Sequence, residues 1–242
     1  MPNVWIGTSG WTYDAWRGPF FPEDVPKRRW LEWYAAQFHT TEVNGSFYRT
    51  PSLEAVKKWR DETPDDFKFA WKASKFITHW KRLTEKCANS IGLMETRLKV
   101  LGPKLGPVLF QLPPQFKADA PRLANFLKML PKRRRRYAFE FRDQSWYDDA
   151  ILDILRKRNV ALCLSDHHDA PSPWIVTADF VYIRGHGPTG EYHSHYSPRT
   201  LNKWAADVKK WKREGLDVYC YFDNDQKSAA PKDAKRLSEL MQ

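Results

Sequence analysis

A carboxylate and a guanidinium lie two residues apart in the segment 137–142, which has the alternation of a β-strand. Phe139 and Phe141 would point to one side of this strand, and Glu140 and Arg142 to the other. A buried charge without a partner is very costly, so Glu140 needs a cation, a ligand or water. Two interpretations follow: a structural ion pair with Arg142, or a charged pair that belongs to a binding or catalytic site.

Polar side chains of the same kind recur where the other predicted strands end. By alternation, Glu42 shares a strand face with Asn44, and Lys72 shares one with Ala70. If the strands are parallel and close into a barrel, their carboxyl ends meet at one rim, where such groups would line a pocket. The predicted rim residues are Thr8, Ser9, Glu42, Asn44, Lys72, Gln111, Glu140, Arg142, Asp166, Arg184, His186 and Asn224.

Eight strand patterns, mostly alternating with helical patterns, must position these side chains. The predicted strands are residues 4–7, 40–43, 67–72, 107–111, 137–142, 161–165, 180–184 and 217–222. Such alternation is typical of parallel strands joined by crossover helices, and eight units that close on themselves form a (β/α)₈ TIM barrel of the α/β class. The connection 166–179 is rich in proline and has little helical periodicity, which predicts a degraded sixth βα unit.

The composition favours a single globular domain over residues 1–242. The chain has 242 residues, 42% of them apolar and 15% aromatic, which suffices for a large core. No apolar run approaches the roughly 20 residues of a membrane helix, so we expect no membrane partner. The first residues lack a signal-peptide pattern, and Cys87, Cys163 and Cys220 lack the spacing of a metal site. These features together predict a cytoplasmic protein.

The net charge of +11 suggests an anionic partner. The densest basic runs, 132–136 and 156–158, precede predicted strands, so barrel topology places them at the end opposite the predicted pocket. They could bind acidic polymers weakly by counterion release, but they would not contribute side chains to the predicted pocket.

The predicted pocket balances cations against carboxylates. One interpretation is a structural network in which these charges pair only with one another and bind no ligand. Another is a small anionic ligand, such as a phosphate-bearing substrate, held by Arg and Lys, with Glu140, Glu42 or Asp166 as the catalytic acid or base. Two carboxylates could also cleave a glycosidic bond. The charged residues concerned are Lys72, Arg142 and Arg184, against Glu42, Glu140 and Asp166.

A tight metal site is not predicted, and neither is a cofactor. Histidines fall near the strand ends, but none has the HExxH arrangement, and the neighbouring Arg and Lys residues oppose a cation. The segment 7–10 could present backbone N–H groups to a phosphate, although a tight turn is the simpler interpretation. Aromatic residues are no denser in the predicted strand-to-helix connections than elsewhere. Trp11, Trp146 and Tyr192 are the candidates there for stacking on a ligand, and packing in the core or in a lid is the simpler interpretation for each. The histidines concerned are His167, His168, His186, His193 and His195.

The strand ends also resemble a known family. The chain is similar to the YecE-like proteins, grouped as domain of unknown function 72, and the resemblance covers nearly the whole chain in order. The matching stretches are 6–11 with Tyr13, Trp16 and 21–22; 41–44 with 47–48; Lys72 with 78–79; 110–114; 139–142 with 145–146; 165–166; 182–184 with 186–187, Tyr192 and Tyr196; and 221–225.

The resemblance implies a TIM barrel with a polar strand-end pocket. A suggested likeness of the family to barrel-type endonucleases implies DNA binding, and those enzymes carry a histidine-rich multi-metal site that this mouth, with its Arg and Lys residues, does not reproduce. Whether the protein is an enzyme is therefore left open among several readings: a hydrolase or lyase acting on an anionic ligand, a non-catalytic nucleic-acid-binding protein, a metal-dependent phosphodiesterase, or a barrel that binds a neutral sugar.

Overall fold

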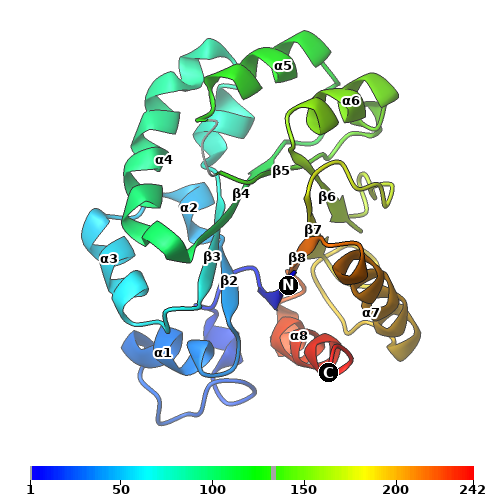
Figure 1. Ribbon diagram of the computed structural model, residues 1–242. Coiled ribbons are helices and arrows are strands. Elements are labelled where there is room, and N and C mark those ends of the chain that lie inside the picture. The colour runs from blue at the N-terminus through cyan, green and yellow to red at the C-terminus, as the bar shows by residue number, and fades with distance from the viewer. Residues whose placement is uncertain (1, 132–134) are drawn as a thin grey trace.

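Eight parallel strands surrounded by helices form the fold, as Figure 1 shows. The computed structural model describes residues 2–131 and 135–242. The strands are β1 (Val4–Thr8), β2 (Thr40–Val43), β3 (Lys68–Lys72), β4 (Leu105–Gln111), β5 (Tyr137–Glu140), β6 (Ala161–Ser165), β7 (Phe180–Gly185) and β8 (Asp217–Phe222). The α-helices are α1 (Trp30–Ala35), α2 (Gly45–Tyr48), α3 (Leu53–Asp61), α4 (Ala88–Leu101), α5 (Ala120–Met129), α6 (Asp149–Lys157), α7 (Pro198–Arg213) and α8 (Ala229–Glu239).

Short helical turns lie in the connections. The one that matters for the site is the π-helical turn η3 (Phe76–Trp80), which follows β3. The others are 3₁₀ turns: η1 (Asp14–Trp16), η2 (Lys27–Arg29), η4 (Glu85–Cys87), η5 (Gly102–Lys104), η6 (Gln144–Trp146) and η7 (Gln226–Ser228).

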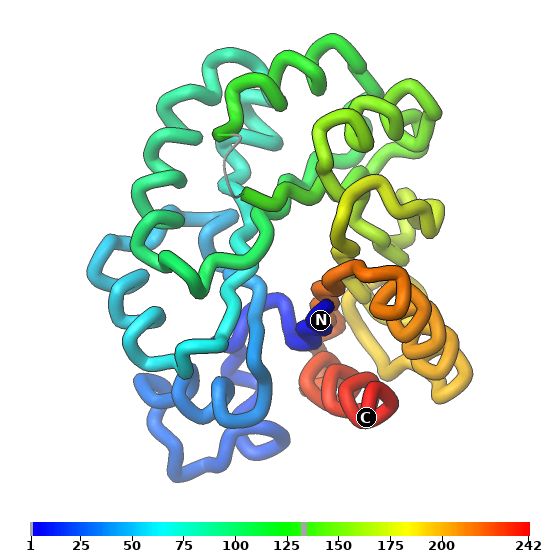
Figure 2. Tube along the Cα trace, in the orientation of Figure 1, coloured from blue at the N-terminus to red at the C-terminus, as the bar shows by residue number. Residues whose placement is uncertain are grey.

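The sheet closes on itself, which confirms the predicted TIM barrel. Its strand order is β1-β8-β7-β6-β5-β4-β3-β2, and a bridge between Ser9 and Glu42 joins the two outer strands. The chain thus runs once around the barrel, and Figure 2 shows the N-terminal strand beside the C-terminal elements.

The seam between β1 and β2 depends on one tyrosine from α1. The Tyr34 hydroxyl accepts from the Thr8 amide and from Thr8 Oγ1, both at 2.9 Å, and donates to the Thr40 carbonyl oxygen at 3.0 Å. A Cβ at Gly7 would clash with the same Thr40 oxygen, so only glycine permits this close approach of the two strands.

Strand alternation separates the apolar residues into two clusters. Phe69, Trp71, Phe139 and Phe141 pack outward in the cluster that the helices cover. A second cluster fills the barrel interior and consists of Ala70, Leu109, Ala138, Ala161, Cys163, Phe180, Tyr182, Tyr219 and Tyr221, with Trp5 and Ala178 against it. The aromatic side of the third and fifth strands therefore faces the helices, and the polar side faces the barrel axis.

The sixth unit lacks its helix, also as predicted. Residues 166–179 contain no helix and run from β6 to β7 as an irregular segment. Trp174 of this segment packs on Trp204 and Trp211 of α7, with ring centroids 5.5 and 5.9 Å away, and Ser172 exchanges hydrogen bonds with the Ser165 backbone at the end of β6. Side-chain packing and local hydrogen bonds thus fill the place of a helix.

Candidate functional site

The carboxyl ends of the strands carry one connected network of charged side chains. The residues in it continue the inward-facing series of the barrel interior: Lys72 follows Ala70, and Arg184 follows Tyr182 by two positions. Of the predicted rim residues, the network unites Ser9, Glu42, Glu140, Arg142, Asp166, Arg184 and His186, with Tyr192 bonded to Arg142 and Asn44 bonded to Lys72.

Arg184 is the centre of this network. Its Nη1 donates to Glu140 Oε2 at 2.8 Å, while Nη2 donates to Glu42 Oε1 at 2.9 Å and to Asp223 Oδ2 at 2.7 Å. Nη2 also donates to Ser9 Oγ at 3.0 Å. The residue is fully buried, so a cation from β7 joins carboxylates from β2, β5 and the end of β8. Both Nη atoms of its guanidinium bind protein groups, so they are not available to a ligand.

Glu140 and Glu42, predicted as acid or base, are both enclosed by donors. Although burial by itself acts in the other direction, Arg142 and Arg184 hold the pKa of Glu140 well below its usual range. Glu42 accepts from Ser9 Oγ at 2.5 Å and from Tyr182 Oη at 2.6 Å, in addition to Arg184. Both carboxylates therefore orient neighbouring groups, and neither has an oxygen left free for proton transfer.

His186 is held neutral beside these charges. Burial, with the nearby guanidiniums, holds its pKa well below the usual range. Its Nε2 lies 3.0 Å from Arg184 Nη1 and 3.1 Å from Arg142 Nη2, so it must accept, and the proton resides on Nδ1. Asp166 accepts from the His186 amide at 2.7 Å and from the Tyr196 hydroxyl, and burial raises the pKa of its carboxyl to about 6.

Asp223 is the functional candidate that sequence reasoning missed. Its Oδ2 binds Arg184, but no hydrogen-bond partner of Oδ1 is found in the described residues. Burial raises the pKa of this carboxyl above its ordinary value, and Arg184 and Lys72 oppose the rise. The neighbouring Asp225 has its pKa raised to about 6 by burial and by Asp223. Alternation along β8 contained the signal, because Tyr219 and Tyr221 face inward and Asp223 continues that series.

All three cations of the rim keep some bonding capacity within the described residues, Lys72 at Nζ and Arg142 and Arg184 at their buried Nε atoms. Lys72 Nζ makes a single hydrogen bond within the described residues, to Asn44 Oδ1 at 3.2 Å, and lies 4.6 Å from the Phe47 ring centroid. Burial, with Arg184 nearby, lowers its pKa to about 8. Arg142 binds Glu140 Oε1 at 2.6 Å and donates to Tyr192 Oη at 3.1 Å, whereas its buried Nε has no partner in the described part of the chain.

Three further predicted residues lie close to the network but bond elsewhere. Trp11 is 7% exposed and packs edge-on against Trp59, with the ring centroids 5.3 Å apart. Asn224 donates to the Ser194 carbonyl oxygen and to a buried carboxylate of α8, and Gln111 donates to the carbonyl oxygen of the next residue. Trp11 and Asn224 thus fix the loops of the mouth in place.

Comparison with known proteins places this barrel in a family. The family model described as "Protein of unknown function DUF72" matches residues 5–242. The chain belongs to the DUF72 family.

Individual relatives agree with this assignment. UPF0759 protein YecE of Escherichia coli K12 is 33% identical over 129 residues, which are 53% of this chain and 44% of YecE, so the match spans less than half of that protein. UPF0759 protein YunF of Bacillus subtilis is 24% identical, with 98% of this chain and 94% of YunF covered.

Solved structures confirm the fold. A DUF72 protein from Thermotoga maritima superposes with a TM-score of 0.89 at 26% identity and with 99% of both chains covered. A DUF72 protein from Enterococcus faecalis superposes with a TM-score of 0.80 at 19% identity, covering 100% of this chain and 98% of the other. Within the described residues, no helix of this DUF72 chain has the length and apolarity needed to cross a membrane.

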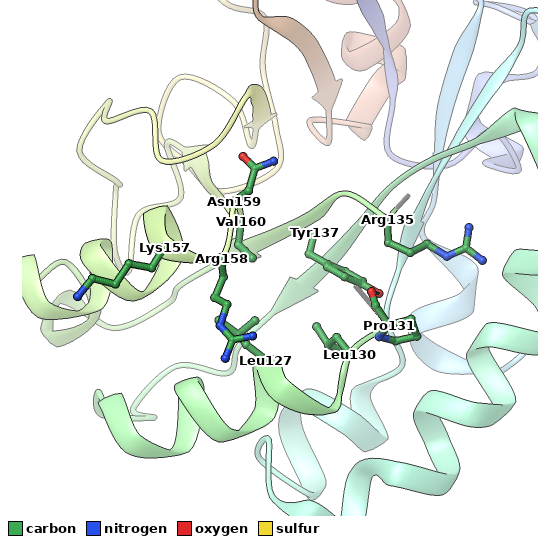
Figure 3. Close-up of a pocket in the computed structure, with 9 residues that line it drawn as sticks. All are labelled: Leu127, Leu130, Pro131, Arg135, Tyr137, Lys157, Arg158, Asn159 and Val160. Carbon is green, nitrogen blue, oxygen red and sulfur yellow. Dashed lines mark hydrogen bonds between the residues drawn. The ribbon is translucent and has the colours of Figure 1, made fainter. Parts of the chain in front are cut away.

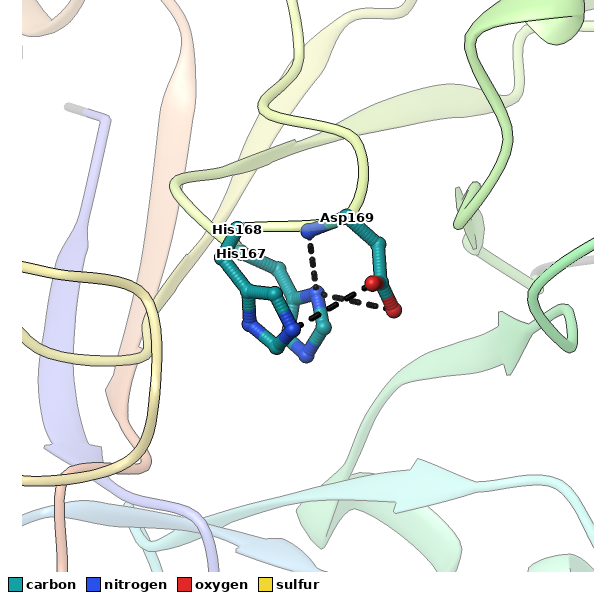
Figure 4. Close-up of side chains that lie close together, drawn as sticks. All are labelled: His167, His168 and Asp169. Atoms are coloured by element: carbon teal, nitrogen blue, oxygen red, sulfur yellow. Dashed lines mark hydrogen bonds and ion pairs between the residues drawn. The ribbon is translucent and has the colours of Figure 1, made fainter.

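One group of side chains in the DUF72 mouth has the composition of a metal site. His167, His168 and Asp169 bring ligand atoms within 4.8 Å of one another (Figure 4). However, His167 Nδ1 already accepts from the Asp169 amide at 3.2 Å, and His168 Nε2 lies 3.2 Å from an Asp169 oxygen. The other histidines considered from the sequence point elsewhere: His193 contacts Glu191 and His195 contacts Asp233. Within this group, His167 Nδ1 and His168 Nε2 therefore already have protein partners.

The opposite end of the barrel carries the described residues of the basic runs, as predicted. Arg135, Lys157 and Arg158 line a cavity of about 480 Å³ between α5, β5 and the start of β6 (Figure 3). Arg136 lines a second cavity there and binds Asp217 at 2.6 Å. The rest of the first run, 132–134, lies outside the described residues. This basic end is separated from the mouth by the filled barrel interior.

Proposed function

We propose that the mouth binds a small anionic, phosphate-bearing ligand between Lys72 and Arg142, and that the protein is a hydrolase or lyase in which Asp223 transfers the proton. The observation that carries this is a difference in bonding among neighbouring charges. Glu42 and Glu140 have protein partners on both carboxylate oxygens, whereas Lys72 Nζ and Asp223 Oδ1 have spare capacity within the described residues. Arg142 and Arg184 each keep one buried Nε without a partner there.

The free donors of the mouth favour an anion. Lys72, Arg142 and Arg184 lie among the carboxylates of Glu42, Glu140, Asp166 and Asp223, so the mouth is not a surplus of positive charge, and the spare bonding capacity of Lys72 Nζ is what an anion would use. A phosphate group can accept from the Lys72 ammonium, a donor that commonly binds it, while the buried guanidinium of Arg142 contributes positive charge. Arg142 is only 5% exposed and held by Glu140, so its position is fixed before the ligand arrives.

Asp223 is the group suited to move a proton. A catalytic acid needs a pKa closer to neutrality than that of a free aspartate, and burial supplies this shift. A bound anion would raise the pKa of Asp223 further, so the carboxyl would enter the reaction protonated and protonate the leaving group. Glu140 cannot take this role because two guanidiniums hold it ionised.

The test is a panel of phosphate esters and inorganic phosphate, screened by thermal shift and followed by calorimetry and product analysis. Lys72→Met and Arg142→Met should each weaken binding about tenfold or more, as expected for loss of a charge-assisted contact. Lys68→Met is the matched control, because Lys68 lies on the same strand at the other end of the barrel and binds the Pro103 carbonyl oxygen.

Asp223→Asn separates binding from chemistry. It should keep most of the affinity and lose turnover by about 10²- to 10⁴-fold, the usual contribution of general acid–base catalysis. Equal affinities of Lys72→Met and Lys68→Met would refute the anion site, and wild-type turnover in Asp223→Asn would remove this carboxyl from the reaction.

A further inference from the structure

Exposed large apolar side chains gather beside the mouth. Within the described part of the chain they are Tyr48, Phe76, Trp80 and Leu93, with exposures of 64%, 43%, 61% and 45%. Single exposed apolar residues scattered over a surface need no explanation, but several in one region mark an interaction site. All four come from the two connections that follow β2 and β3 and from the adjoining helix α4.

These side chains form a continuous surface, which we call the aromatic patch (Tyr48, Lys75, Phe76, Trp80 and Leu93). The Phe76 and Trp80 rings lie 4.1 Å apart. The Lys75 ammonium lies 5.8 Å from the Tyr48 ring centroid and 5.4 Å from that of Trp80, so it stands between the two. Phe76 and Leu93 also line a cavity of about 330 Å³ beneath the patch.

The two connections that carry the patch hold only basic charges, and the next acidic residues along the chain are Glu54 and Glu85. The connections 44–52 and 73–84 contain no acidic residue, but they contain four fixed cations: Arg49, Lys75, Lys81 and Arg82. In the described residues, no carboxylate lies within ion-pair distance of these four, although ion pairs are common elsewhere on the surface. Exposed rings between unpaired cations match a polyanion that carries planar groups.

The patch adjoins the mouth through two neighbouring residues. Phe47, next to Tyr48, covers the Lys72 ammonium, and the ring of His79, next to Trp80, lies 5.0 Å from Phe47. The π-helical turn η3 thus presents His79 to the mouth and Phe76 and Trp80 to the outside. Such π-helical turns are rare in proteins overall, and those that occur are often found at functional sites.

We propose that the aromatic patch binds single-stranded nucleic acid, with bases stacked on Tyr48 and Trp80 and phosphates held by Lys75, Lys81 and Arg82. A single strand is required because a duplex keeps the faces of its bases covered. This binding goes beyond the proposed function and is independent of it, since no group of the mouth takes part.

The experiment is fluorescence anisotropy of a labelled single-stranded 12-nucleotide oligothymidylate with the full chain, at about 50 and about 200 mM salt. Wild-type affinity should fall steeply between the two salt concentrations. Trp80→Ala and Tyr48→Ala should each weaken binding about tenfold at low salt, the size expected for loss of one stacked base. A duplex of the same length should bind more weakly than the single strand.

Control variants distinguish the aromatic patch from the basic end of the barrel and from the mouth. Lys157→Ala removes an exposed cation at the opposite end of the barrel and should leave affinity unchanged, whereas Lys75→Ala should reduce it and flatten the salt dependence. Lys72→Met, which tests the mouth, should also leave oligonucleotide affinity within twofold. No binding at low salt, equal affinity of Trp80→Ala and wild type, or equal losses in Lys157→Ala and Lys75→Ala would each overturn the proposal. So would a wild-type dimer that Trp80→Ala converts to a monomer, because a second copy would then cover the patch.

Discussion

Arg184 on β7 donates from Nη1 to Glu140 Oε2 on β5 at 2.8 Å, with β6 lying between the two strands. Both side chains are fully buried, and Arg142 holds the other oxygen of the same carboxylate at 2.6 Å. Since Glu42, Glu140 and Asp223 all bind Arg184, this one cation joins the carboxylates of three different strand ends.

Removing Arg184 should destabilise the fold strongly. Arg184→Met leaves the buried carboxylates of Glu42, Glu140 and Asp223 without their common cation, and breaking a buried pair from one side costs about 3–5 kcal/mol. Urea unfolding measures the loss. Arg156→Met is the control, because its pair with Asp153 is exposed and should contribute about 0–1 kcal/mol. A change in Arg184→Met no larger than that of the control would contradict the account.

Affinity for a phosphate ester should decline as pH rises through about 8. The pKa of Lys72 is lowered to about 8, so its ammonium is charged below that pH and neutral above it, while Arg142 stays charged throughout. A phosphate monoester is already dianionic above about pH 7, so the ligand does not titrate in this range. Calorimetry between about pH 7 and 9.5 should show the decline in wild type. Lys72→Arg, which cannot lose its charge, should bind with a flat profile, and a decline retained in that variant would assign it to another group.

His186 should stay in one neutral tautomer over the whole accessible pH range. Its pKa is held well below the ordinary value by burial, and two guanidiniums face Nε2. Nitrogen-15 NMR should therefore show a protonated Nδ1 and an unprotonated Nε2 from about pH 5 upward. Detection of an imidazolium at His186 near neutral pH would be incompatible with the network described.

Tyr34→Phe should loosen the β1–β2 seam. The variant leaves the buried Thr8 amide and the Thr40 carbonyl oxygen without the hydroxyl, and an unsatisfied buried group costs about 1–3 kcal/mol. Tyr48→Phe removes an exposed hydroxyl and should be close to neutral. Chemical denaturation compares the two, and hydrogen exchange should show the added opening in β1 and β2. If the amides of β1 and β2 were as well protected from hydrogen exchange in Tyr34→Phe as in wild type, backbone contacts alone would close the barrel.

Much of the architecture was accessible from the sequence because strand alternation is a local property. The alternation in β3 and β5 indicated which side chains share a face of the strand, and the proline-rich segment 166–179 indicated the missing helix. The same rule placed Lys72, Glu140 and Arg184 at one rim, where the structure finds them together.

Which of these groups pair, and which remain free, was decided only by the tertiary structure. Sequence reasoning selected Asn224 at the end of β8, but the strand turns its neighbour Asp223 toward Arg184. Likewise, the number of aromatic residues in the connections did not indicate a binding surface, whereas the exposure of individual side chains does. Trp11 is buried, at 7% exposure, and Trp80 is 61% exposed. The physical reason is that alternation fixes a side chain's direction from its own strand. Pairing and burial depend instead on what strands and loops distant in sequence bring to the same place.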